Sequence, residues 1–411
     1  MVLELRGPVV ISLEVTTLCN SNCPGCSNVF PHEHSEKLLT APQWDSLIRK
    51  LSPYVQEFRI TGGEPILRSD LFDILSSLEE EKKYYHIFTN GLWKDADAMA
   101  DRFQSFAHLS SFLVSLHGHT GESHLSFAGK DSFQQVTGTI RTLVQAGFEV
   151  NTNAVLTKDN AKHIEDLVNL SCELGAKGTV FNRYIGIPRE GVSVSEEELQ
   201  GALEKIDELQ KQGYNCLIGN CVPYCFFPSS SSGCLAGITF GTVDPFGNLR
   251  PCNHSPRIIG SLLKEEVSHL WKSKALRKWR EQLPRECSRC IKLSYCPSGC
   301  RAIADLLSEP CDPLIRGHVK KERLPEKILE ITLEEDLCPS PRFITRQEEF
   351  GLALIHHTQV IPVSHRAKAI IEMVDGKTTL REIEKRHGSA SLSFLYSLYI
   401  RNFIDFSGSR P

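Results

Sequence analysis

Short apolar runs alternate with longer amphipathic stretches along about the first 212 residues of the chain. The apolar runs predict strands at Val9–Val15, Phe58–Thr61, Tyr85–Thr89, Ser111–Leu116, Phe148–Leu156 and Gly178–Tyr184. The amphipathic stretches predict helices after Thr40 and at Ser69–Lys82, Asp95–Phe106, Ser132–Ala146, Ala161–Leu174 and Ser195–Gln212. This alternation predicts an α/β fold with about six βα units around a parallel sheet. Because a closed barrel needs about eight units, we expect a partial, TIM-like (β/α)6 barrel that binds its ligands at the carboxyl ends of the strands.

The pattern changes twice further along the chain. Residues 214–318 contain many cysteines and few long periodic segments, which is typical of a module that needs metal to hold its fold. A charged connector follows at Lys320–Glu335. Beyond it, the pattern predicts a β-hairpin from Leu352–His356 and Gln359–Val363. Three helices are then predicted, at His365–Met373, Leu380–Arg386 and Leu392–Arg401. We therefore expect a barrel domain at 1–213, a cysteine-rich domain at 214–318 and a small winged-helix domain at 336–411.

Composition excludes several classes of function. The formal net charge of −4 over 411 residues implies no strong attraction to nucleic acid or to anionic lipid. The chain contains no apolar run of about 18 residues, the length that a membrane-spanning helix needs, and its first residues do not have the pattern of a signal peptide. We therefore expect a cytoplasmic protein.

The fifteen cysteines are the unusual feature of the composition. In a reducing compartment, so many thiols indicate metal binding rather than disulfides. Three of them lie between Cys19 and Cys26 and eleven between Cys216 and Cys338. This distribution predicts one metal site near the N-terminus and a separate cysteine-rich module. The remaining one, Cys172, follows Leu167 and Leu170 on an apolar helix face, so we expect it in the core.

Cys19, Cys23 and Cys26 have the spacing C-x3-C-x2-C directly after the first predicted strand. Three thiolates can hold three irons of a [4Fe–4S] cube and leave the fourth iron open. The alternative is a zinc site completed by His32 or His34.

The second predicted strand is followed by Thr61-Gly62-Gly63-Glu64-Pro65. Paired glycines let the backbone approach a ligand closely. One βα unit after C-x3-C-x2-C, this motif resembles the radical S-adenosylmethionine (SAM) superfamily. The resemblance implies that the three cysteines bind a [4Fe–4S] cluster and that Gly62, Gly63 and Glu64 contact SAM. It also implies that a reduced cluster cleaves SAM to methionine and a 5′-deoxyadenosyl radical, which abstracts hydrogen from a C–H bond.

Other strand ends extend the resemblance to this family. Ser115 and Asn153 are candidates for cofactor contacts, with ordinary strand-end polar residues as the alternative, and Arg183 resembles the family's basic residue at the end of the sixth strand. One position departs from the family. The residue before the third cysteine is often aromatic and packs near the adenine, but here it is Gly25, so adenine packing must come from another part of the chain.

Cys234 is followed by Gly247-x4-Cys252, then by Cys287-x2-Cys290-x5-Cys296-x3-Cys300, and finally by Cys311. One for one, these cysteines resemble the seven-cysteine pattern of the SPASM module, which follows the barrel in many peptide-modifying radical enzymes. The resemblance implies two auxiliary [4Fe–4S] clusters. Cys234, Cys252 and Cys300 would bind the first, with Cys225 preferred over Cys221 as the fourth ligand. The second would be bound by Cys287, Cys290, Cys296 and Cys311. If neither Cys221 nor Cys225 binds, the first cluster has an open iron that could hold a substrate thiolate. A pair of zinc sites is the alternative.

The segment from Ile370 to Ile383 resembles the helix–turn–helix of the PqqD-like peptide-recognition element of ribosomal-peptide pathways. The resemblance implies that a leader peptide adds to the preceding hairpin as an extra strand. The alternatives are a winged helix that binds DNA or one that only packs on the enzyme. In the last predicted helix Arg401 is the one basic residue, which disfavours DNA binding.

Together these features predict a radical SAM enzyme that modifies a ribosomally made precursor peptide, by forming a thioether or carbon–carbon crosslink. An electron donor such as flavodoxin or ferredoxin is expected as a second partner. The alternatives are an enzyme that oxidises a serine or cysteine on a folded protein, as in sulfatase maturation, and a non-catalytic iron–sulfur sensor with a DNA-binding tail. The sequence singles out no catalytic acid or base.

Overall fold

The computed structural model describes residues 3–26, 37–229, 233–293, 296–317 and 336–407. Two of the predictions concern residues outside these ranges. One is the charged connector at 320–335, and the other is the pair of alternative zinc ligands, His32 and His34.

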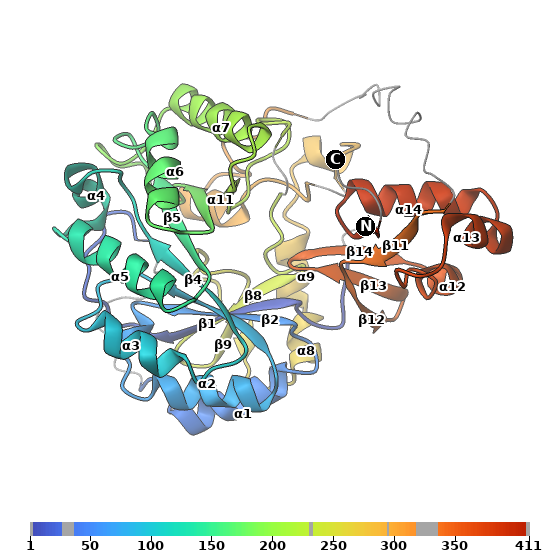
Figure 1. Cartoon of the computed structure of the whole chain (residues 1–411), viewed down its shortest axis with the longest axis horizontal. Helices are drawn as coiled ribbons and strands as arrows, with labels where there is room; N and C mark the ends of the chain where they lie inside the picture. Colours follow the sequence, from blue (N-terminus) through green and yellow to red (C-terminus); the bar gives the residue numbers. More distant parts are fainter. Residues whose placement is uncertain (1–2, 27–36, 230–232, 294–295, 318–335, 408–411) are drawn as a thin grey trace.

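One sheet of ten strands forms the centre of the larger lobe (Figure 1), in the order β10-β9-β8-β1-β2-β3-β4-β5-β6-β7. Its strands are β1 (Val10–Thr16), β2 (Glu57–Gly62), β3 (Tyr84–Thr89), β4 (Leu109–Ser115), β5 (Val150–Leu156), β6 (Gly178–Arg183), β7 (Cys216–Ile218), β8 (Phe240–Val243), β9 (Asn248–Arg250) and β10 (Gly260–Ser261). The six expected strands pair in parallel and in sequence order. The prediction of an open, partial α/β barrel is therefore confirmed.

Two further parallel strands extend the expected six. Strand β7 pairs with β6 at one side, and β8 pairs with β1 at the other. Both come from the segment after residue 213, which was expected to contain few regular elements. The sheet therefore continues across the predicted boundary between the first two domains. Both strands are only three or four residues long, which is why their short apolar runs give little signal in the sequence.

Helices cover the outer face of the sheet (Figure 1). They are α1 (Ala41–Leu51), α2 (Leu71–Glu80), α3 (Ala96–Phe103), α4 (Gly121–Ala128), α5 (Phe133–Gln145), α6 (Ile164–Glu173) and α7 (Glu196–Lys211), with the 3-10 turn η1 (Pro65–Leu67) after β2. Burial alternates along the strands: in β5, Ala154 and Leu156 are buried in the core shared with the helices, whereas Asn151 and Asn153 are only half-buried. The second set of positions therefore faces the open interior of the barrel.

The expectation that Cys172 belongs to the core is wrong, because its side chain is exposed. The buried positions of α6 are Ile164, Leu167, Val168 and Ser171, which follow the i, i+3, i+4, i+7 spacing of one helix face. Position 172 lies one residue past that face.

The cysteine-rich segment adds four short helices, α8 (Val267–Trp271), α9 (Lys274–Arg280), α10 (Arg285–Ser288) and α11 (Arg301–Leu307). Trp271 and Trp279 are fully buried in the same hydrophobic cluster as Ile11 of β1. The segment therefore shares a core with the barrel instead of forming one of its own.

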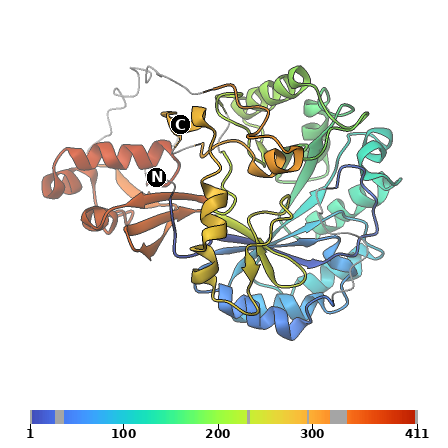
Figure 2. The same ribbon diagram turned by 180° about the vertical axis from the view of Figure 1, so that it is seen from behind.

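Residues 336–407 form a smaller lobe beside the barrel, and both views show the separation (Figures 1 and 2). Its elements are β11 (Cys338–Pro341), β12 (Ile344–Glu348), β13 (Gly351–His356), β14 (Gln359–Val363), η3 (His365–Ala367), α12 (Lys368–Ile371), α13 (Leu380–His387), α14 (Ala390–Ile400) and β15 (Ile404–Ser407). The expected hairpin is confirmed as β13 and β14, whereas β12 and the β11–β15 pair were not expected. The lobe has its own hydrophobic core.

A buried ion pair fastens this lobe to the amino ends of the barrel strands. Arg346 and Glu348 of β12 lie 2.6 Å apart and are almost inaccessible to solvent. The guanidinium of Arg346 also donates to the carbonyl oxygens of Gly7 (3.0 Å), Pro8 (2.9 Å) and Tyr54 (2.6 Å). A small apolar cluster adds to this contact: Leu5, Val9, Val10, Ala353 and Ile355. Among the described residues, no helix has the length and apolar character to cross a membrane.

Candidate cofactor and iron–sulfur sites

Cys19, Cys23 and Cys26 lie together in the loop that follows β1. Their sulfurs are close enough to interact electrostatically, and burial raises the pKa of Cys23 to about 11, with Cys26 and Cys19 adding to the effect. Three thiols in this arrangement resist ionisation until a cation compensates their charge. The loop therefore has the chemistry of a three-thiolate metal site.

Gly62 and Gly63 allow this loop to lie directly on the end of β2. The amide of Gly63 donates to the carbonyl of Thr16 (2.8 Å), and that of Glu64 donates to Leu18 (2.7 Å). A Cβ on Gly63 would lie 2.0 Å from the Leu18 oxygen, and one on Gly62, whose φ is +131°, would lie 2.4 Å from the Thr16 oxygen. Only glycine permits this approach. Direct contact of these glycines with SAM remains a prediction.

The side chain of Glu64 is directed into the protein. Its carboxylate accepts hydrogen bonds from the Thr89 hydroxyl (2.8 Å) and from the amides of Asn90 (2.7 Å) and Ile66 (3.2 Å). Burial nevertheless raises the pKa of Glu64 to about 7. The structure does not support the expected contact between this side chain and the cofactor, because the carboxylate braces the ends of β2 and β3.

Asn90 is a residue whose role the sequence did not reveal. Its side-chain amide donates to the Asn20 side chain (2.8 Å) and to the sulfur of Cys19 (3.7 Å). Asn20 in turn donates to the carbonyl of Leu92 (2.9 Å). Glu64 thus holds Asn90, and Asn90 holds the first cysteine of the loop. Asn90 directly follows β3, but the sulfur that it contacts lies 71 residues earlier in the chain, so this contact exists only in the folded protein.

Ser115 and Asn153 are brought together, because the last residue of β4 pairs with the middle residue of β5. Both are half-buried on the interior side of the barrel. Asn182 of β6 joins them by donating from its side chain to the oxygen of Asn153 (2.5 Å). The alternation of burial along β6 is the signal that could have identified Asn182.

Arg183 is not part of this interior row. It is 4 % exposed and forms a bidentate ion pair with Asp312, in which Nη1 lies 3.1 Å from Oδ1. Because Asn182 faces the interior, its neighbour in the strand faces the other way. The structure therefore does not support the expected cofactor contact of Arg183. Its ion pair with Asp312 instead links the end of β6 to the cysteine-rich segment.

Two aromatic rings occupy the space beside Gly25. A Cβ at this position would lie 2.5 Å from the ring of Phe127 in α4 and 2.9 Å from the ring of Tyr184, which follows β6. The aromatic group that Gly25 lacks is thus supplied next to it by two other elements.

Four cysteines form a first group in the later part of the chain: Cys221, Cys234, Cys252 and Cys300. Hydrogen bonds with Cys234 and Cys300 raise the pKa of Cys221 well above its usual value, and the same hydrogen bonds lower the pKa of Cys234 and Cys300. Burial and the charges of Cys300 and Cys234 raise the pKa of Cys252. The expected preference for Cys225 at this site is not supported, since Cys221 takes that place.

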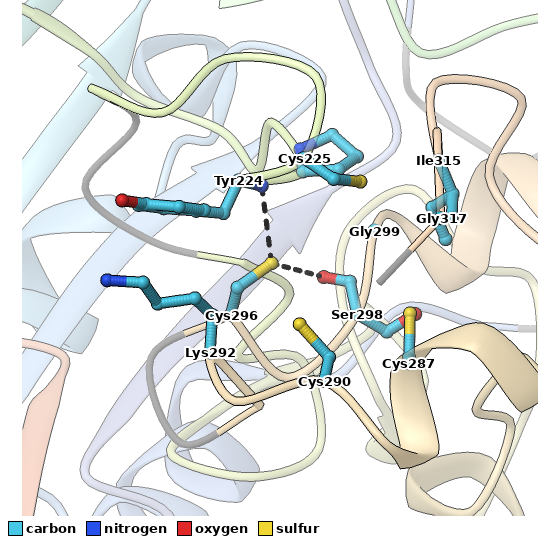
Figure 3. Close-up of a pocket in the computed structure, with 11 residues that line it drawn as sticks. Tyr224, Cys225, Cys287, Cys290, Lys292, Cys296, Ser298, Gly299, Ile315 and Gly317 are labelled. Carbon is cyan, nitrogen blue, oxygen red and sulfur yellow. Dashed lines mark hydrogen bonds between the residues drawn. The ribbon is translucent and has the colours of Figure 1, made fainter. Parts of the chain in front are cut away.

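Four other cysteines line one pocket (Figure 3): Cys225, Cys287, Cys290 and Cys296. Burial raises the pKa of Cys287 to about 11, with contributions from Cys296, Cys225 and Cys290. Cys311 lines a neighbouring hollow, which shares Ser298 and Gly299 with this pocket, and its neighbouring charges are Glu286, Asp312 and Glu309. The structure therefore does not place Cys311 with the second group, as the sequence had predicted.

Both groups fit a four-thiolate site. A [4Fe–4S] cube takes one cysteine per iron, and each group offers four sulfurs. Those of the first group come from separate segments, whereas three of the second group come from residues 287–296. Four thiolates can also bind zinc, so geometry alone leaves both metals open.

Comparison with known proteins decides the class. Residues 13–171 match the family model described as Radical SAM superfamily, and residues 234–291 match the model described as Iron-sulfur cluster-binding domain. The chain is 25 % identical over 333 residues to the AdoMet-dependent heme synthase of Methanosarcina barkeri, covering 74 % of this chain and 94 % of that protein. It is 24 % identical over 364 residues to the PqqA peptide cyclase of Xanthomonas oryzae pv. oryzae, covering 83 % of this chain and 95 % of that protein.

Solved structures share the fold. SuiB of Streptococcus suis bound to its precursor peptide SuiA superposes with a TM-score of 0.65 at 18 % identity, covering 76 % of this chain and 77 % of that one. The enzyme anSMEcpe with bound AdoMet gives a TM-score of 0.59 at 19 % identity, covering 73 % of this chain and 90 % of that one.

The motif matches, the partial barrel and the clustered cysteines together define a radical SAM enzyme. Within that class, it is one whose barrel is followed by an iron–sulfur cluster-binding domain. Its cofactors are SAM, the [4Fe–4S] cluster that binds SAM, and auxiliary iron–sulfur clusters.

Proposed function

We propose that this enzyme modifies a ribosomally made precursor peptide, whose leader segment binds the C-terminal lobe. The relatives support a peptide substrate, since the PqqA peptide cyclases are named for one and SuiB was solved with its precursor peptide. The proposal rests on one observation. A radical SAM barrel is joined to a lobe in which, among the described residues, one outer strand of the sheet has no strand paired with its far side.

That edge is β14. In the order β12-β13-β14, the outer strand β14 has no further strand beside it among the described residues. Strand β12, at the other side, holds the ion pair that fastens the lobe to the barrel. Pro362 within β14 agrees with this reading, because proline is tolerated on edge strands. A leader peptide can add to β14 as a fourth strand and place alternate side chains toward the helices of the lobe.

The lobe offers apolar contacts for such a strand. Phe394 and Tyr399 of α14 are only partly buried against the lobe's core, as is Ile361 of β14. These side chains can receive apolar groups of a bound leader, while backbone hydrogen bonds supply affinity.

In the barrel, SAM bound to a reduced cluster would supply a 5′-deoxyadenosyl radical that abstracts hydrogen from a peptide C–H bond. The chain itself positions the reactants. Cys19, Cys23 and Cys26 would hold the cluster, and the row of Ser115, Asn153 and Asn182 would offer hydroxyl and amide groups to the cofactor's polar parts.

Tyr184 and Phe127 would pack against the adenine. Their rings fill the space beside Gly25, where the family's usual aromatic residue would stand, and stacking on a purine is worth about 0.5–1.5 kcal/mol beyond simple burial. A flavodoxin or ferredoxin would supply the electron, and a thioether or carbon–carbon crosslink is the product class we propose.

Hydrogen exchange of the anaerobic holoenzyme tests the leader site. Adding the leader peptide of a neighbouring precursor gene should slow amide exchange in Gln359–Val363, because strand addition protects backbone amides. A scrambled leader is the control. Exchange that slows only in the barrel would contradict leader binding by the lobe.

Activity tests the chemistry. The holoenzyme with SAM, a reductant and the precursor should release 5′-deoxyadenosine and lower the peptide mass by about 2 Da, the loss of two hydrogens that a crosslink requires. Cys23→Ala, which removes a thiolate of the SAM cluster, is the matched control. Cofactor cleavage without any change in peptide mass, for every neighbouring peptide, would contradict the proposal.

A further inference from the structure

We propose that Cys225, and not Cys311, completes the second auxiliary cluster. The Cys221–Cys225 segment would then give one thiolate to each cluster, as the Cys296–Cys300 segment does in the ligand set that the seven-cysteine pattern implies. This inference rests on the auxiliary clusters of the enzyme but not on its peptide substrate. It departs from the ligand set that the seven-cysteine pattern implies.

The first segment divides between the two groups. Its first cysteine, Cys221, lies within hydrogen-bonding distance of Cys234 and Cys300, whereas its last, Cys225, lines the pocket with Cys287 and Cys290. A span of three intervening residues can reach about 10–13 Å when extended, so one segment can serve two neighbouring clusters.

The second segment divides in the opposite order. Cys296 lies with Cys225 and Cys290, as their electrostatic interaction shows, and Cys300 lies with Cys221 and Cys234. The two segments are joined directly, because the backbone amide of Tyr224 donates to the sulfur of Cys296 (3.5 Å, Figure 3). Each cluster thus receives ligands from both segments.

Cys225 has the environment of a thiolate ligand. Its sulfur accepts a hydrogen bond from the amide of Arg316 at 3.3 Å. Backbone amides that donate to sulfur stabilise its negative charge. Figure 3 shows its side chain beside the same pocket as Cys287, Cys290 and Cys296.

Cys311 lines the adjacent hollow and not that pocket, and its neighbour Asp312 anchors the turn. Asp312 accepts hydrogen bonds from the amide of Cys300 (2.6 Å) and from Arg183, which ties this turn to the first group. The charges nearest to Cys311 are the carboxylates of Glu286, Asp312 and Glu309. Carboxylates on this side would disfavour an anionic cluster.

The assignment decides how the auxiliary clusters can act. With four cysteines around each, neither cluster retains an iron that is open to a substrate thiolate. The open auxiliary iron that the sequence allowed, in the case that neither Cys221 nor Cys225 is a ligand, is thereby replaced by clusters bound entirely by protein thiolates.

Alkylation of the anaerobic holoenzyme tests the ligand set without any variant. After brief treatment with iodoacetamide and peptide mass spectrometry, we expect Cys311 to be modified as fully as the exposed Cys172, and Cys225 to be protected at least tenfold. Iron-bound thiolates are shielded from alkylation. Protection of Cys311, or modification of Cys225 to the level of Cys172, would overturn the assignment.

Variants give the second measurement. Cys311→Ala should retain the parent's iron, about twelve per chain, and its EPR spectrum. Cys225→Ala should lose one cluster, about four irons, or convert it to a three-iron form with its own EPR signal. Cys172→Ala is the matched control. Loss of a cluster signal in Cys311→Ala but not in Cys225→Ala would refute the proposal. Modification of the peptide by either variant is a separate measurement, which tests the proposed function and not the ligand set.

Discussion

Asp312 receives the guanidinium of Arg183 on one side and the backbone amide of Cys300 on the other, so a single carboxylate connects the end of β6 to an auxiliary cysteine. Both side chains are nearly inaccessible to solvent. The carboxylate therefore links β6 directly to the loop that holds part of the first auxiliary group.

Breaking this pair should destabilise the enzyme strongly. Arg183→Met leaves Asp312 buried without its cation, which costs about 3–5 kcal/mol. We expect a lower midpoint of thermal unfolding and less iron in the first auxiliary site, measured by anaerobic calorimetry and iron analysis. Lys177→Met, which removes an exposed ion pair with Glu149, should cost no more than about 1 kcal/mol. Equal effects of the two substitutions would contradict a special role for the buried pair.

Glu64 should make stability depend on pH. Its pKa is raised to about 7 in the folded protein by burial, from 4.5. A carboxyl group whose folded pKa is raised binds its proton more tightly when folded, so its contribution to stability is greatest below the unfolded pKa and falls as the pH rises from about 4.5 to about 7.

Glu64→Gln does not titrate and should show a flatter pH profile. Its amide presents donors to the Asn90 amide, which costs about 1–3 kcal/mol. The stability gap between parent and variant should therefore be wider at pH 5 than at pH 7.5 in anaerobic urea unfolding. A gap that widens as the pH rises would show that the folded pKa of Glu64 lies below its unfolded value, contrary to the burial effect.

Gly63 should not tolerate a side chain. Gly63→Ala places a methyl group 2.0 Å from the Leu18 oxygen, so the cysteine loop must shift. We expect loss of about four irons, from the SAM cluster, with the auxiliary clusters retained. Gly138→Ala in α5, where nothing lies within 4 Å, should instead be neutral or stabilise the helix by up to about 1 kcal/mol. Full iron content in Gly63→Ala would refute the role given to this close approach.

Tyr184 should contribute to SAM affinity. Tyr184→Ala removes one of the two rings beside Gly25, and the loss of an aromatic stacking contact of about 0.5–1.5 kcal/mol corresponds to a two- to tenfold rise in Kd. Equilibrium binding of SAM to the reconstituted parent and variant enzymes measures this change in Kd. Tyr214→Ala, at an exposed turn, should leave Kd unchanged, and equal Kd values for all three proteins would remove Tyr184 from the adenine site.

Much of the architecture followed from the sequence alone. The alternating pattern predicted β1 to β6 and the β13–β14 hairpin, because each has a local apolar run of sufficient length. It did not predict β7 and β8, since a three- or four-residue strand is defined by the neighbour with which it pairs. The C-x3-C-x2-C spacing and the strand-end glycines indicated the SAM cluster, because those residues are close in the chain.

Tertiary structure decided the choices that depend on which way a side chain faces. Asn182 and Arg183 are adjacent in the sequence, yet the side chain of Asn182 faces the barrel interior, whereas that of Arg183 forms an ion pair with Asp312. Cys221 and Cys225 both suited the first auxiliary site by spacing, and Cys311 suited the second. Spacing fixes only how far a sulfur can reach, whereas the crossing of two loops determines which four sulfurs meet, and that crossing exists only in the folded chain.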